Sequence, residues 1–123
     1  MRGDKLSVLS LRFSVEIIHL AQRLQRQHEY IISNQIGRSG TSIGANIREA
    51  QYGYSKPDFI SKLQIALKET NETDYWLDLL LETEYLSKEE YERLSDSCKE
   101  LRITLIHSIN TAKENLPNPG KKS

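Results

Sequence analysis

The chain has 123 residues, 37% hydrophobic and 28% charged, with a formal net charge of zero and one cysteine. This composition excludes a disordered chain, an internal disulfide and a strongly charged polyanion binder, and three prolines with six glycines favour long helices over a turn-rich β fold. No signal-peptide pattern or apolar run of membrane length is present, so we expect a cytoplasmic protein without a membrane segment.

The first predicted helix starts at the N-cap Asp4 and runs to near Gln27. One apolar stripe at helical spacing consists of Leu6, Leu9, Phe13, Ile17, Leu20 and Leu24. A second stripe lies nearly opposite and consists of Val8, Leu11, Val15 and Ile18. A surface helix of a monomer needs only one apolar face, so the second stripe predicts burial against something outside the chain's own core.

The second predicted helix, from Tyr30 to about Tyr52, contains a glycine-rich stretch that resembles a phosphate-binding loop. The residues Ala45 and Asn46 follow the last glycine where a Walker loop needs Lys and Ser or Thr, and G-x-G-x-x-G is absent. The glycines instead share a narrow arc beside the apolar face, and each costs a helix about 1 kcal/mol unless close packing offsets it. We therefore predict a helix-packing face formed by Gly37, Gly40, Gly44 and Asn46.

The third predicted helix begins after Ser55, with Pro57 in its first turn, and extends to about residue 84. Its main stripe consists of Phe59, Leu63, Ala66, Thr70, Thr73, Leu77 and Leu81. Another stripe has the 4, 3, 4, 3 spacing of a helix–helix seam and consists of Ile65, Glu69, Glu72, Trp76 and Leu79.

The fourth predicted helix begins at a capping box formed by Ser87 and Glu90, and Pro117 ends it. Its apolar stripe consists of Tyr91, Leu94, Cys98, Leu101, Leu105, Ile109 and Ala112. We expect residues 117–123 to form a disordered tail.

The segments SIGANIREA (42–50) and IALKETNETDYWL (65–77) resemble the family of four-helix proteins encoded in intervening sequences of bacterial 23S ribosomal RNA genes. The resemblance implies an all-α, up-down four-helix bundle over residues 1–116 and a ring-shaped homo-oligomer, with a pentamer favoured. The fold is also similar to the accessory protein of diversity-generating retroelements, which partners a reverse transcriptase and nucleic acid. The biochemical role that the resemblance implies is otherwise poorly defined.

The second stripes of the first and third helices predict the subunit interface of this oligomer. The alternative is an irregular bundle in which these residues cover one another. Glu69 and Glu72 could serve as acid/base groups or metal ligands, but we expect them to meet a basic or hydroxyl partner across the subunit boundary, such as Arg48 or Arg38.

No metal site, cofactor or catalytic centre is expected. Glu16-x-x-His19 resembles half of a di-iron motif, but no second Glu-x-x-His occurs. The lone Cys98 lies on a core stripe, and no signature of a catalytic triad is present. We therefore expect a protein that is not an enzyme.

A basic row on the first helix is the best binding candidate. Residues 1–50 hold seven Lys/Arg against four Asp/Glu, a net charge of +3, and the row consists of Lys5, Arg12, His19, Arg23 and Arg26, interrupted by Glu16. At helical rise it spans about 32 Å, several phosphates of a duplex. We expect structured RNA, DNA or a nucleoprotein as partner; the alternatives are a merely solvated face and a scaffold that binds another protein.

Overall fold

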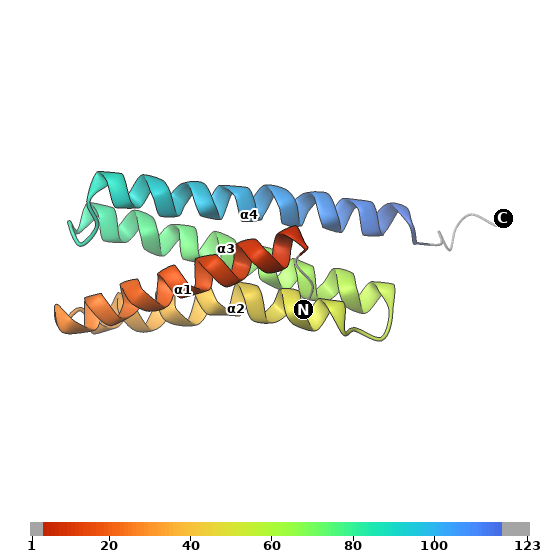
Figure 1. Ribbon diagram of the computed structural model, residues 1–123, viewed down its shortest axis with the longest axis horizontal. Helices are drawn as coiled ribbons and strands as arrows, with labels where there is room; N and C mark the ends of the chain where they lie inside the picture. Colours follow the sequence, from red (N-terminus) through yellow and green to blue (C-terminus); the bar gives the residue numbers. More distant parts are fainter. Residues whose placement is uncertain (1–3, 117–123) are drawn as a thin grey trace.

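The computed structural model describes residues 4–116 and consists of four long helices in an up-down arrangement (Figure 1). The helices are α1 (Lys5–Arg26), α2 (Tyr30–Gln51), α3 (Lys56–Glu82) and α4 (Lys88–Glu114). Helices that follow one another in sequence pack side by side, and α1 packs against α4 less closely than the other neighbours do. The expected tail, 117–123, lies outside the described residues.

Each helix begins where a side chain accepts a hydrogen bond from a free backbone N–H of the first turn. Asp4 accepts from the N–H of Ser7 at 3.0 Å, and Ser55 and Ser87 cap α3 and α4 in the same way. Glu29 caps α2, with its carboxylate 2.7 Å from the N–H of Ile32. The helix starts are therefore fixed by local chemistry that the sequence already contains.

The core lies between the four helices, and on α3 its buried positions follow coiled-coil spacing. These positions are Ile60, Leu63, Ala66, Thr70, Thr73, Leu77 and Leu80. The main stripe predicted for this helix differs from the buried one at its ends: Ile60 and Leu80 are buried, Leu81 is half-buried, and Phe59 is half-buried although it packs against the core. A straight 3.6-residue stripe drifts off the seam over 27 residues, whereas a 3.5-residue repeat stays on it.

The helices α1 and α2 are held close together by the three glycines of α2, which face α1. A Cβ atom added to Gly40 would lie 2.7 Å from Cγ2 of Ile17, so the glycine backbone already fills the available space. An added Cβ at Gly44 would lie 3.4 Å from Oγ of Ser14, and one at Gly37 would lie 3.7 Å from Cβ of Ala21. Asn46 donates to the backbone carbonyl of Ser42 at 2.9 Å.

The helices α2 and α3 share a hydroxyl pair that is fully buried. The hydroxyl of Thr73 donates to the carbonyl of Glu69 at 2.8 Å, so it accepts the 2.8 Å bond from the hydroxyl of Ser39. Both partners are hydrogen-bonded, as buried polar groups need to be. No helix within residues 4–116 is long and apolar enough to cross a membrane.

Candidate functional site

The outer side of α1 exposes a row of large apolar side chains. Leu11 is 61% exposed, Val15 47% and Ile18 44%, and these three residues form what we call the α1 apolar row. Val8, predicted on the same stripe, is half-buried. The helix therefore has two apolar faces, of which only one contacts the core of its own chain.

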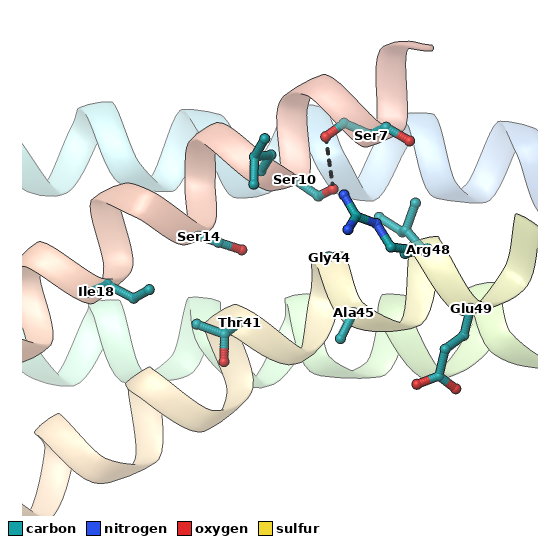
Figure 2. A pocket seen from close by; sticks show the side chains of 11 residues that line it. Ser7, Ser10, Ser14, Ile18, Thr41, Gly44, Ala45, Arg48 and Glu49 are labelled. Carbon is teal, nitrogen blue, oxygen red and sulfur yellow. Dashed lines mark hydrogen bonds between the residues drawn. The ribbon is translucent and has the colours of Figure 1, made fainter. Parts of the chain in front are cut away.

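A groove of about 490 Å³ runs between α1 and α2 beside this row (Figure 2). Its walls carry mostly small side chains, and its lining consists of Ser7, Ser10, Leu11, Ser14, Ile18, Thr41, Gly44, Ala45, Ile47, Arg48 and Glu49. Figure 2 shows Arg48 extending from α2 toward α1, while Glu49 points away from the groove. Glu49 forms an ion pair with Lys62 at 3.1 Å. Arg48 forms no ion pair within residues 4–116, so it is an unpaired cation at a groove whose other charged lining residue, Glu49, is already paired.

The outward side of α3 carries a network of charged groups next to an aromatic pair. The guanidinium of Arg38 on α2 lies 3.3 Å from the carboxylate of Glu69 and also bonds to Glu72. The indole N–H of Trp76 donates to the same Glu72 carboxylate at 3.1 Å, and the ring packs edge-on against Tyr75. One guanidinium thus serves two carboxylates, which leaves this network with an excess negative charge.

The predicted stripe on α3 is less exposed than that on α1. Ile65 is 39% exposed, but Trp76 and Leu79 are half-buried against the core of their own chain. The partner expected for Glu69 and Glu72 was correct in type, since Arg38 is one of the two named candidates. The predicted position across a subunit boundary was wrong, however. Arg38 belongs to the same chain, because α2 packs directly against α3 and brings Arg38 alongside both carboxylates.

The basic row of α1 is partly neutralised inside the chain. Arg23 forms two 2.8 Å bonds to the carboxylate of Glu90 at the start of α4, and these bonds raise the pKa of the guanidinium. Glu16, which interrupts the row, forms an ion pair with Arg93 of α4. Three exposed Lys and Arg members form no ion pair within residues 4–116, namely Lys5, Arg12 and Arg26, and the exposed His19 also forms none there.

Among residues 4–116 no group of three or more His, Cys, Asp or Glu side chains is placed to hold a metal ion. Burial raises the pKa of the Cys98 thiol to about 12, and the nearby Asp74 carboxylate adds to this shift. The thiol is therefore neutral at ordinary pH and unsuited to nucleophilic or metal chemistry.

Residues 5–107 match the sequence model of the 23S rRNA-intervening sequence protein family. The chain belongs to this family. A crystal structure of a protein of unknown function from the S23 ribosomal protein family of Bacteroides thetaiotaomicron is 51% identical, with a TM-score of 0.83 over 85% of this chain and 97% of that chain. None of the curated proteins matches the sequence. The resemblance carried by the two sequence segments is confirmed, and the 23S rRNA-intervening sequence family accounts for the four-helix fold.

Three parts of this surface were missed by the sequence reasoning. The groove-lining serines Ser7, Ser10 and Ser14 recur at helical spacing between the two apolar stripes of α1, and this spacing is the signal that would have predicted a small-residue groove. Tyr75 is 58% exposed beside Trp76, but the pattern gave no reason to separate the two aromatic residues. Arg48 was named only as a partner for carboxylates and not as part of a groove.

Proposed function

We propose that this member of the 23S rRNA-intervening sequence family is a non-enzymatic bundle that works as a ring-shaped homo-oligomer, with five copies favoured. The observation that carries the proposal is the α1 apolar row, whose three side chains are 44–61% exposed in a single copy. The number of copies rests on the family resemblance alone.

The energetic argument for self-association starts from the burial of this row. Fully burying a Val, Leu or Ile side chain stabilises by about 1.5–3 kcal/mol, and the row is already about half buried, so each residue has roughly half of that left to gain. The row continues into the α1–α2 groove, which makes one contiguous surface of the kind that marks an interaction site. Closed symmetric assemblies are the commonest solution for such a surface in soluble proteins.

Light scattering and native mass spectrometry at micromolar concentration test the assembly directly. We expect the wild-type particle to be several times 14.2 kDa, and Val15→Glu to reduce its mass while helicity by circular dichroism is kept. Asn110→Glu, at an exposed position of α4, is the matched control and is expected to keep the wild-type mass. A wild-type protein that is monomeric under these conditions would refute the proposal.

Binding of structured RNA or DNA is a second candidate function, favoured by the three cations of α1 that have no ion-pair partner in the described part of the chain. Lys5, Arg12 and Arg26 are all exposed, and a ring repeats them once per copy, so a nearly neutral chain can still present a multivalent cationic surface. The S23 ribosomal protein family named for the 51% identical relative makes structured RNA the first probe to use.

Fluorescence anisotropy against a structured RNA and a DNA duplex at two salt concentrations tests this second candidate. We expect binding that weakens with salt and is reduced at least several-fold in Arg12→Gln/Arg26→Gln, while Lys113→Gln on α4 serves as the control. Absence of binding at low salt would leave the scaffold alternative, for which a protein partner must be recovered stoichiometrically after nuclease treatment.

A further inference from the structure

We propose that the contact between copies is heterologous: the α1–α2 groove of one copy receives the outward side of α3 from a second copy. This inference rests on the proposed homo-oligomer and identifies its two contacting surfaces. The donating surface, which we call the α3 ridge, consists of Ile65, Glu69, Glu72, Tyr75 and Trp76. The receiving surface is the groove with its rim residues Leu11 and Ile18.

The groove is shaped to accept side chains from another helix. Small residues line its floor on both helices, so little side chain fills the space there; these are Ser10, Ser14, Gly44 and Ala45. Leu11 forms an exposed apolar rim. Its volume of about 490 Å³ falls within the range of roughly 300–1,000 Å³ that proteins use for bound molecules, which is room for several side chains of one helix. Figure 2 shows the short side chains of Ser14 on α1 and Thr41 on α2, which belong to the two walls of the groove.

The α3 ridge is preorganised as the insert. Tyr75 is 58% and Ile65 39% exposed, so both have apolar surface to bury. Trp76 is held by its bond to Glu72, and its ring packs against that of Tyr75 with the ring centres 5.1 Å apart. Rotamers that are already fixed lose little entropy on binding, which favours the ridge as the inserted element.

The charges of the two surfaces are complementary. The ridge network has two carboxylates, on Glu69 and Glu72, and a single guanidinium from Arg38. The groove offers the guanidinium of Arg48, which has no ion pair within residues 4–116. Docking the ridge on the groove gives the excess carboxylate a second cation, and complementary charges of this kind select partner and register.

The exposed isoleucines of α4 are the competing insert. Ile103 is 59% exposed and Ile106 42%, so this row is as apolar as the ridge. The surface around Ile103 is lined by Lys5, Asp96, Lys99 and Glu100, whose charges balance. It offers no excess carboxylate for Arg48, and we therefore assign the groove to α3.

A heterologous interface has a consequence that an isologous one lacks, because a copy with only one intact surface can still bind a copy with only the other. The groove variant is Leu11→Glu/Arg48→Glu, and the ridge variant is Ile65→Glu/Tyr75→Glu. All four positions are exposed, so the fold is expected to persist, which circular dichroism checks. Ile103→Glu is the matched control on α4.

Native mass spectrometry of each protein alone and of the equimolar mixture reads out the result. We expect each variant alone to have the mass of one chain, 14.2 kDa, the mixture to contain a one-to-one heterodimer, and Ile103→Glu to keep the wild-type mass. If the wild type assembles but the two variants do not combine, the groove–ridge assignment is overturned. A dimer of either variant alone, or a loss of assembly in Ile103→Glu only, also overturns it. A monomeric wild type instead overturns the proposed oligomer itself, so the two failures are distinguishable.

Discussion

The substitution Gly40→Ala is expected to destabilise the bundle although alanine is the better helix former. The added Cβ would lie 2.7 Å from Cγ2 and 3.0 Å from Cγ1 of Ile17. Ile17 is fully buried and β-branched, so it has no alternative rotamer into which to retreat. Overpacking of this kind costs about 1–3 kcal/mol. The gain from removing a glycine in a helix is about 1 kcal/mol, and the net effect is a loss of up to about 2 kcal/mol.

Gly37→Ala is the matched control, because its added Cβ would make an ordinary 3.7 Å contact with Cβ of Ala21. Urea unfolding followed by circular dichroism, at one fixed protein concentration, is expected to show Gly37→Ala stabilised by about 1 kcal/mol and Gly40→Ala destabilised. In an Ile17→Ala background, which removes the two closest carbons and leaves the Cβ atom at 3.2 Å, Gly40→Ala should lose most of its penalty. Equal stabilisation by Gly37→Ala and Gly40→Ala in the wild-type background would refute the close-packing argument.

Three further substitutions test single features of the fold by the same unfolding assay. Glu84→Gly is expected to stabilise by about 1 kcal/mol, because Glu84 has a φ of 66°, which non-glycine residues adopt at a cost; an unchanged midpoint would contradict this. Thr73→Val is expected to cost about 1–3 kcal/mol, because the buried Ser39 hydroxyl loses its partner. Ser39→Ala is expected to cost less, because in that variant the Thr73 hydroxyl still donates to the carbonyl of Glu69. Burial, reinforced by Asp78, raises the pKa of Asp74 above its ordinary 3.8, so the folded state favours the protonated carboxyl and stability falls as pH rises through the raised pKa. Asp74→Asn is therefore expected to stabilise at pH 7 relative to wild type, with an advantage that shrinks on acidification; an advantage that grows toward acid pH would reverse the argument.

The helices could be predicted from sequence because their determinants are local. The N-caps Asp4, Ser55 and Ser87 are visible in the chain, and the ends expected near Gln27 and Tyr52 fall one residue beyond the observed ones. Apolar spacing also predicted which side of α1 faces the core. These features depend on residues three or four positions apart in the sequence, so helical periodicity is enough to predict them.

Pairings between helices could not be predicted in the same way, because they depend on the register of one helix against another. Glu90 illustrates the difference: its backbone N–H completes the predicted cap with Ser87, but its carboxylate bonds to Arg23, 67 positions away. The sequence likewise predicted a basic partner for Glu72 but not that Arg38 of the same chain supplies it. Arg23 of the basic row is neutralised by this pairing with Glu90, so one fewer cation is free to contact a nucleic acid.

The spacing between α1 and α2 connects stability to the proposed assembly. At Gly40 the glycine backbone meets the buried Ile17, whereas at Gly44 it meets the small side chains of Ser10 and Ser14, and the space that these leave is the groove. A substitution that pushes the helices apart at Gly40 therefore also changes the width of the groove a turn further along α2. If a second copy docks there, Gly40→Ala has to weaken assembly as well as folding, whereas Gly37→Ala leaves both the contact with α1 and the groove intact. A Gly40→Ala protein that is destabilised yet assembles with unchanged affinity would show that the groove does not take part in the contact between copies. That contact would then lie elsewhere on the molecule.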